Sequence, residues 1–263
     1  IVAALSKTAE NEKIDIRKGT KAIALVKAKN RIVGVKVREI DGKEYTIKAK
    51  AVIVATGGFG ANAKMVEKYN PKLKGFGSTN SPAIVGDGII MVEKVGGALV
   101  DMSEIQTHPT VVYNKTNMIT EAVRGEGAIL VNKDGKRFID ELETRDVVSK
   151  AILSQKGKSA FLIFDEDIRT KLKAADGYVK KGFAVEGTLE EIAAKIGTDA
   201  KTLEATLNKY NEAVRDKVDS EFNKKTLPKE LTGTKYYAIE VSPAVHHTMG
   251  GVRINTNAEV LGK

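Results

Sequence analysis

The sequence predicts an α/β protein in which strand-rich regions at the two ends flank a middle region of helices and shorter strands. Residues 14–56 alternate apolar and polar side chains and are rich in Val and Ile, which is typical of strands. A run of apolar residues then leads into a glycine-rich turn, TGGFG, and a helical pattern follows it. The composition changes near residue 103 and again near residue 230, which marks two candidate domain boundaries.

The N-terminal elements follow from local pattern. Residues 1–13 are typical of the end of a helix, because apolar side chains appear at helical spacing with no capping residue before them. Residues 14–56 predict a β-meander whose last strand, Ala51 to Thr56, is buried. A helix is expected over about residues 62–69. A second helix would have one apolar face, made by Ile89, Ile90, Val92 and Val95.

The middle and the end of the chain show shorter elements. The runs AILVN and SAFLIFD predict strands, while TLEEIAAKIG and AKTLEATLNKYNEAVRDKV predict a packed pair of amphipathic helices. The chain returns to strand at KYYAIEV and ends on GGVRINTNAEV, a strand, a polar turn and the start of another strand. Both ends fall inside predicted elements, so we expect a piece of a longer protein.

Composition excludes several classes of function. The formal net charge is +9, but the lysines are scattered and aromatic residues make up only 5%, so the stacking surface of a single-strand nucleic-acid binder is missing. No cysteine is present, which excludes disulfides, thiolate chemistry and iron–sulfur ligation by this chain. No run approaches the roughly 18 apolar residues of a membrane span. We therefore expect no nucleic-acid partner and no membrane embedding.

Two glycine-rich stretches are candidate ligand contacts. In ATGGFG the glycines follow the predicted buried strand, where a main chain without bulky side chains can approach a ligand closely. In GDGIIM, Asp87 stands at a helix start and is either a capping residue or a ligand contact. Glycine-rich turns after strands are common, so neither stretch alone identifies a cofactor.

The three histidines are stronger candidates. His108 lies in IQTHPT, and His246 and His247 lie in AVHHTMGG; both stretches are predicted loops beside Pro or Gly, where functional side chains concentrate. No carboxylate stands at the spacing of a zinc motif, and neighbouring residues of an extended chain point to opposite sides. We therefore expect no metal site.

Two further charged groups have alternative interpretations. Arg145 precedes a helix and is surrounded in sequence by acidic residues, so by itself it is typical of a surface ion-pair cluster. Glu121 and Arg124 have the spacing of an i,i+3 pair on a helix surface. From the residues alone, the structural interpretation is favoured for all three.

An ordered set of motifs adds a resemblance that covers nearly the whole chain. The stretches IVATGGFGAN, GDGIIM, THPT, TEAVRGEGAILVN, GKRFIDE with ETRD, and HHTMGGVRINTNAEV together resemble the flavoprotein of the fumarate reductase/succinate dehydrogenase family, most closely the soluble periplasmic flavocytochrome c fumarate reductases. The resemblance implies a Rossmann-like FAD-binding domain interrupted by an α+β capping, or clamp, domain. The FAD-binding parts would be residues 1–102 and 230–263, the clamp would be residues 103–229, and the location would be periplasmic.

The resemblance also implies roles for individual residues. Arg145 would be the active-site acid, and Glu121 with Arg124 would return its proton. His247 stands where many members have Tyr, which puts the tuning of the flavin in question. The residues that bind substrate would be His108, Thr120, Glu121 and His246. The residues that contact FAD would be Ala22, Ala55, Thr56, Gly57, Asp87 and His247.

Several partners are implied, and rival functions stay open. The substrate pair would be fumarate and succinate, with electrons arriving through a haem c domain outside this chain or a quinol-linked cytochrome. The GxGxxG loop for FAD is absent from this chain, so the chain alone is expected to be inactive. A sister enzyme could instead reduce urocanate or methacrylate, or oxidise succinate or aspartate. A non-catalytic cofactor-binding or interaction module is the alternative from another class.

Overall fold

The computed structural model describes residues 1–263 and divides into two compact units. Unit 1 contains residues 1–57, 87–100 and 252–263, and unit 2 contains residues 58–86 and 101–251. These units do not follow the expected domain boundaries, because residues 58–86 and all of 230–251 belong with the central part of the chain. The division into an FAD-binding domain and a clamp concerns function and stays a prediction.

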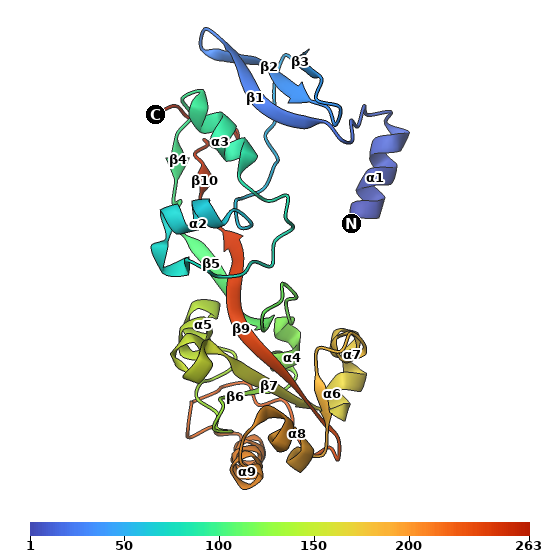
Figure 1. Ribbon diagram of the computed structural model, residues 1–263, viewed down its shortest axis with the longest axis vertical. Helices are drawn as coiled ribbons and strands as arrows, with labels where there is room; N and C mark the ends of the chain where they lie inside the picture. Colours follow the sequence, from blue (N-terminus) through green and yellow to red (C-terminus); the bar gives the residue numbers. More distant parts are fainter. The chain divides into compact units, whose positions relative to one another are not determined.

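Unit 1 contains the predicted meander. Strands β1 (Lys21–Ala28), β2 (Arg31–Arg38) and β3 (Glu44–Lys48) form an antiparallel sheet in the order β1-β2-β3, drawn in blue in Figure 1. The first hairpin closes at Ala28 and Arg31, which face each other across a two-residue turn. Helix α1 (Val2–Asn11) precedes the sheet, as the N-terminal pattern predicts.

The expected buried strand at Ala51 to Thr56 was wrong. No element is assigned between residues 49 and 59, and Ile53 is 91% exposed. An apolar β-branched run predicts a strand only if another strand is there to receive its hydrogen bonds. No strand of this chain pairs with the run, so it forms no strand.

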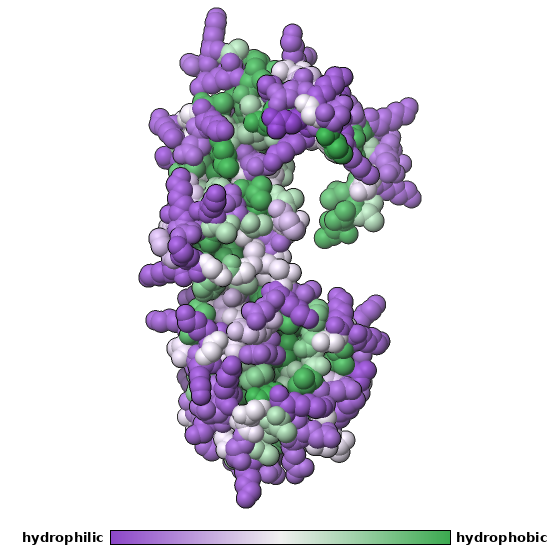
Figure 2. All heavy atoms as spheres, viewed as in Figure 1, coloured by the Kyte–Doolittle hydropathy of each residue, from purple (hydrophilic) through white to green (hydrophobic).

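The other elements of unit 1 are short. Helix α3 (Asp87–Lys94) buries Ile89, Met91 and Val92, close to the apolar face that the sequence predicts. Strand β4 (Leu99–Val100) pairs with β10 (Gly251–Val252). The space-filling view is mostly hydrophilic, and it shows a concentration of apolar surface on α1, where Ile1, Val2 and Leu5 are exposed (Figure 2).

Unit 2 is organised around one long strand, β9 (Tyr236–Thr248), which Figure 1 shows in orange-red. Its first half pairs with β7 (Ala160–Asp165) and with β8 (Val185–Gly187), and its second half pairs with β5 (Ile105–Val112). Strand β6 (Ile129–Val131) extends the sheet beyond β7. All these pairings are antiparallel.

Helices complete unit 2. Helix α5 (Arg145–Ser154) packs on β5 and β9, and α8 (Leu189–Ile196) packs on α9 (Ala200–Asp216) and β8. The sequence-predicted helix pair is confirmed as α8 and α9, which begin at side-chain caps made by Thr188 and Asp199. The helices are α2 (Ala63–Tyr69), α4 (Glu121–Gly125), α5 (Arg145–Ser154), α6 (Glu166–Lys171), α7 (Lys173–Lys180), α8 (Leu189–Ile196) and α9 (Ala200–Asp216), with 3₁₀ turns at Pro71–Leu73 and Lys156–Lys158.

The main hydrophobic core lies in unit 2. Strands β6 and β7 are buried on both faces, which explains their nearly continuous apolar sequences. Leu203, Leu207 and Tyr210 bring one face of α9 into this core, and Val148 and Ile152 bring in α5. The core thus fixes the helices and strands that carry the candidate site. None of the helices has the length and apolar character that a membrane crossing requires.

Candidate active site

Four elements of unit 2 carry the candidate residues. Strand β5 contributes His108, strand β9 contributes His246, helix α4 begins at Glu121 and helix α5 begins at Arg145. Pairing of β5 with β9 brings the two histidine rings to a centroid separation of 5.4 Å in an edge-to-face arrangement. The expectation that the histidines lie in loops was wrong, since they lie in strands.

A β-bulge changes the direction of the two neighbouring histidines. Gln106 pairs with His247 and Thr107 pairs with Val245, so His246 is an extra residue in β9. A bulge redirects side chains at the point where it interrupts the ladder. The rings of His246 and His247 consequently lie 4.1 Å apart between centroids, and the expectation that they point to opposite sides was wrong.

His108 is buried and has no side-chain hydrogen-bond partner. Its exposed fraction is 0%, and neither Nδ1 nor Nε2 has a partner within the chain. Burial, together with the positive charge of Arg124, lowers the pKa of His108 to about 3, so the ring is neutral at pH 7. Buried polar groups without partners are rare in folded proteins. An unpartnered ring beside another histidine is consistent with a ligand site.

His246 is oriented by residues from a distant loop. Its Nδ1 lies 2.7 Å from Thr79 Oγ1, and Asn80 Nδ2 donates a hydrogen bond to its main-chain oxygen at 2.8 Å. The single Thr79 hydroxyl proton can go either to His246 Nδ1 or to the Val245 main-chain oxygen at 3.3 Å. When it goes to Nδ1, the ring proton is on Nε2, which can then donate to an anion. Burial and the nearby His247 lower the pKa of His246, so this ring also tends to be neutral.

The start of α4 presents groups that the helix does not use. Thr120 occupies the N-cap position but makes no side-chain cap hydrogen bond, and its main-chain N–H donates to the Tyr178 hydroxyl at 3.0 Å. Its own hydroxyl is therefore available to another partner. The side chain of Glu121 is 47% exposed, so a ligand and water can both reach it.

Arg145 is held from two sides at the start of α5. Its Nη1 donates to Gln106 Oε1 at 2.9 Å, and its Nε and Nη2 approach Glu121 Oε2 at 3.4 Å. The interpretation of Arg145 as part of a surface cluster with the acidic residues next to it in sequence was wrong. None of those residues pairs with it, and its partners come from β5 and α4 instead.

Arg124 is not on the helix surface. Its side chain is 1% exposed, and its Nη2 lies 4.0 Å from Glu121 Oε2, so the predicted pair exists with its cation buried. The guanidinium donates one hydrogen bond, from Nη1 to the main-chain oxygen of Glu141, and its Nε and Nη2 make no hydrogen bond. Burial lowers the pKa of Arg124. A buried, underpaired arginine releases a proton more readily than an ordinary one.

The residues expected to contact FAD lie apart in sequence. In unit 1, Ala22 lies in β1, while Ala55, Thr56 and Gly57 are exposed in the unpaired segment after the meander. Asp87 is the first residue of α3, and its carboxylate pairs with Lys21 Nζ at 3.0 Å. In unit 2, His247 is exposed next to His246.

The local geometry in unit 1 suits a cofactor that approaches the main chain. Gly57 has a φ of +73°, which a residue with a side chain rarely adopts. A Cβ on Gly88 would lie 2.1 Å from Thr56 Oγ1, so only glycine lets α3 begin against this segment. An exposed main chain, the Thr56 hydroxyl and the Asp87 carboxylate can each hydrogen-bond to a bound dinucleotide, so these residues fit the cofactor. No group of three or more His, Cys, Asp or Glu side chains is placed to hold a metal ion.

Comparison with known proteins identifies the family. The family model described as "FAD binding domain" matches residues 1–263. The chain belongs to this family. Its relatives include a fumarate reductase (cytochrome) of Shewanella frigidimarina, 48% identical over 99% of this chain and 46% of the relative. A urocanate reductase of Eggerthella lenta is 39% identical over 99% of this chain and 45% of that protein.

A solved structure supports the same fold. The solved structure of a flavocytochrome c3 fumarate reductase in its open conformation has 40% sequence identity to this chain. The TM-score is 0.82, and the match covers 99% of this chain and 47% of that chain. The predicted fold class, an FAD-binding α/β fold with additional helix and sheet, is therefore confirmed, and so is the resemblance to flavocytochrome c fumarate reductases. The chain spans about half the length of the curated relatives it matches.

Sequence reasoning missed four residues of the site. Gln106 bonds to Arg145, and Thr79 with Asn80 positions His246. Gln106 stands two residues before His108, a spacing that puts both on one face of a strand, but the stretch was predicted as a loop. Thr79 and Asn80 had no signal, since they lie more than a hundred residues from His246. Glu141 is the fourth, and its acidic neighbourhood suggested an exposed residue rather than the buried one observed.

Proposed function

We propose that the full-length protein containing this chain reduces fumarate to succinate with FAD as its cofactor. The observation that carries the proposal is the placement of Arg145, which is hydrogen-bonded between Glu121 and Gln106 with buried Arg124 as the second cation of the cluster. A guanidinium held in this way combines a fixed positive charge with a donor for a developing carbanion.

The site has the groups to bind a dicarboxylate. His108 and His246 are neutral rings whose nitrogens can donate to carboxylate oxygens, and Thr120 has a free hydroxyl. Neutral donors hold the substrate without neutralising the cations that the reaction needs. The net charge of the chain, +9, would also attract a dianion.

Arg145 would be the proton donor. The ordinary pKa of arginine exceeds about 12, so it is a weak acid towards most bases. The carbon next to the second carboxylate becomes strongly basic as the alkene is reduced, and this makes proton transfer from a guanidinium favourable. The positive charge of the Arg145 guanidinium stabilises the transition state before the proton moves. FAD, when bound and reduced, supplies the hydride to the other alkene carbon.

Glu121 and Arg124 would restore the proton. Glu121 Oε2 is 3.4 Å from Arg145 Nη2 and 4.0 Å from Arg124 Nη2, so one carboxylate oxygen adjoins both cations. Its 47% exposure gives it access to water. The lowered pKa of Arg124 favours transfer from Arg124 through Glu121 to Arg145.

The remaining parts of the reaction belong to the whole protein. We expect electrons to arrive through a haem c domain outside this chain or a quinol-linked cytochrome, and we expect the enzyme to work in the periplasm. Residues 103–229 would act as a clamp that excludes water from the site, which strengthens its electrostatic interactions.

Urocanate is the second candidate substrate. The relative named urocanate reductase is 39% identical to this chain, and urocanate is also a conjugated acid. Urocanate has one carboxylate and an imidazole ring. The proposed site instead has two histidines, His108 and His246, each of which would bind one carboxylate. Two carboxylate-binding positions favour fumarate.

The test is the reoxidation of a reduced dye by the full-length flavoprotein. Arg145→Ala should lower fumarate-dependent turnover by at least about 1,000-fold, since it removes a donor of charge and proton, while the flavin absorbance is unchanged. The matched control is Arg215→Ala, which removes a half-exposed arginine of α9 that pairs with Glu230, and it should leave turnover intact. Near-normal turnover in Arg145→Ala, or faster turnover of wild type on urocanate or methacrylate than on fumarate, would refute the proposal.

A further inference from the structure

A buried network of charges lies beside the candidate site. Glu141 and Lys224 have side chains that are 0% exposed, and Lys224 Nζ lies 2.7 Å from Glu141 Oε2. Arg137 donates to both oxygens of Glu141, from Nε at 2.9 Å and from Nη2 at 3.1 Å. Arg137 Nη2 also donates to Asp219 Oδ2 at 2.9 Å. The two cations and two anions compensate each other.

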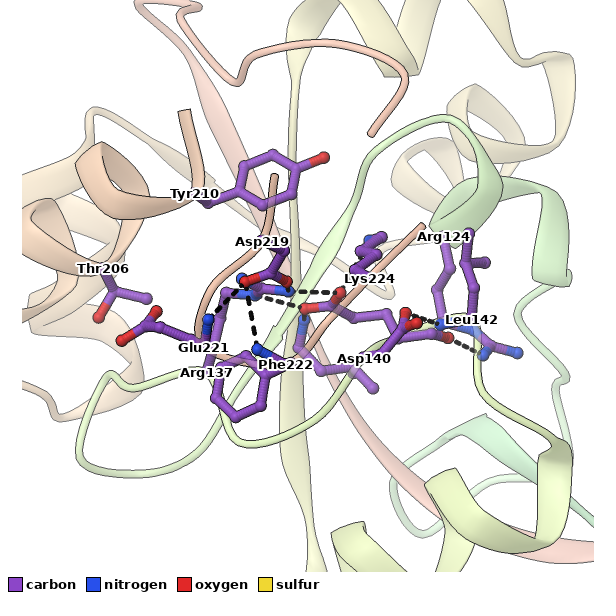
Figure 3. A network of polar contacts seen from close by, with 12 residues as sticks. Arg124, Arg137, Asp140, Leu142, Thr206, Tyr210, Asp219, Glu221, Phe222 and Lys224 are labelled. Carbon is purple, nitrogen blue, oxygen red and sulfur yellow. Dashed lines mark hydrogen bonds and ion pairs between the residues drawn. The ribbon is translucent and has the colours of Figure 1, made fainter. Parts of the chain in front are cut away.

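Aromatic rings flank the network. Figure 3 shows Arg137, Asp219 and Lys224 converging, with Tyr210 on one side and Phe222 on another. The Arg137 guanidinium lies 5.2 Å from the Tyr210 ring centroid and 4.9 Å from that of Phe222. Although burial raises the pKa of a carboxyl, Lys224 and Arg137 outweigh it and lower the pKa of Glu141, which stays ionised. The Glu141 carboxylate is therefore immobilised from several directions.

The main chain of Glu141 has a different partner from its side chain. Its carbonyl oxygen accepts the one hydrogen bond that the Arg124 guanidinium makes. Figure 3 shows Arg124 at the far end of the network, next to Leu142. The segment then turns tightly, with Leu142 N–H donating to Asp140 Oδ1 at 2.8 Å, and reaches Arg145. One residue thus connects the buried ion network to the buried arginine.

We propose that Glu141 is a positioning residue for Arg124. Its carboxylate, held by Arg137 and Lys224, fixes its carbonyl at the point where that carbonyl orients the Arg124 guanidinium towards Glu121. The inference rests on the proposed function, because it assigns Arg124 to the return of the proton to Arg145. No hydrogen bond or ion pair joins the network to His108, Thr120 or His246, and its hydrogen bond to the site is the one that Arg124 donates to the Glu141 carbonyl.

The neutral variant Glu141→Gln separates this role from mere stability. It keeps the size and the main-chain carbonyl but removes the charge that holds the residue to Arg137 and Lys224. We expect kcat for fumarate in the full-length holoenzyme to fall about 10- to 100-fold, as small misplacements of a reacting group do. KM should stay within about threefold, because the substrate-binding groups are not touched. Hydrogen exchange over residues 137–145 should increase.

A double-mutant cycle with Arg124→Lys tests the connection. If Glu141 acts through Arg124, the double variant should be no slower than the slower single variant, whereas independent effects would multiply. The matched control is Asp165→Asn, another carboxylate with 0% exposure that pairs with a lysine, Lys229, at 3.1 Å. Asp165→Asn should lower thermal stability, leave kcat within about twofold and combine independently with Arg124→Lys.

The outcomes are distinguishable. Absence of fumarate reduction by wild type would refute the proposed function itself, and the exchange measurement would still report on the anchoring of residues 137–145. Wild-type turnover with an unchanged kcat in Glu141→Gln, a multiplicative double variant, or an equal loss in Asp165→Asn would overturn the positioning role alone. If Glu141→Gln does not fold, the charge-balanced pair Glu141→Gln/Lys224→Met takes its place. A normal kcat in that pair would equally overturn the proposal.

Discussion

Two charged clusters of unit 2 differ in how completely their groups are paired. In the buried network, Glu141, Lys224 and Asp219 all have charged partners, and only Nη1 of Arg137 lacks one. In the candidate site, both His108 nitrogens and two of the Arg124 nitrogens make no hydrogen bond within the chain. The network is inaccessible to solvent, whereas Glu121 and Arg145 are partly exposed.

The difference separates a structural cluster from a functional one. Buried charges that serve stability must be compensated, because an uncompensated charge in a dry interior is strongly unfavourable. Groups that bind or transform a ligand must keep hydrogen-bond donors or acceptors free for that ligand. The resulting loss of stability is offset by favourable interactions in the rest of the fold. Incomplete pairing in a buried place, more than the number of charges, marks the site here.

The largest expected effect on stability is in the network. Lys224→Met leaves Glu141 with Arg137 as its one cation and should lower the free energy of unfolding by about 3 kcal/mol, in the range for breaking a buried pair. The thermal midpoint of the full-length protein measures this. The double variant Lys224→Met/Glu141→Gln should recover part of the loss, because it removes both charges. Equal losses in the single and double variants would show that packing, not charge, holds the network.

The next effect is in the candidate site, where we expect a loss of activity without a loss of stability. Arg124→Met removes a buried charge with a single hydrogen bond, so the free energy of unfolding should stay equal or rise. The kcat for fumarate should fall about 100-fold, equivalent to about 2.7 kcal/mol, because the return of the proton is lost. Arg137→Met is the control and should destabilise the protein. Destabilisation by Arg124→Met would mean that the two clusters do not differ in this way.

His108 predicts a smaller, pH-dependent effect. Its pKa is about 3 in the folded protein and 6.5 ordinarily, so on acidification below pH 6.5 the unfolded chain binds a proton that the folded chain does not. This residue alone should lower stability by up to about 1.4 kcal/mol per pH unit between those values. Urea unfolding of the full-length protein at pH 7, 6 and 5 should show a shallower decline in His108→Gln. An identical decline would mean that His108 can be protonated in the folded state.

The smallest effect on stability is expected at the exposed glutamate. Glu121→Gln disrupts contacts with Arg145 and Arg124 that are partly exposed or long, and such pairs contribute within about 1 kcal/mol. Its thermal midpoint should therefore match that of wild type, in contrast to Glu141→Gln. A large loss of stability would place Glu121 with the structural network rather than with the site.

Local pattern was enough for most of the elements. The meander, α2, α3, α8 and α9 all follow from the period of their apolar residues and from caps such as Thr188 and Asp199, which act within a few residues. Local pattern failed at Ala51 to Thr56, where the run has the composition of a strand and no partner. Strand formation needs hydrogen bonds from a distant segment, which no window of sequence contains.

The sequence by itself determined which residue types are present and, through the ordered motifs, the family of the chain. Only the tertiary structure decided which of them meet. The antiparallel pairing of β5 with β9 joins His108 to His246, and the bulge places His247 beside His246. Spacing alone favoured a surface pair for Glu121 and Arg124, and folding buried one member and exposed the other. Burial depends on how the whole chain packs, so the pKa of His108 and the pairing of Glu141 could not be read from their neighbours in sequence.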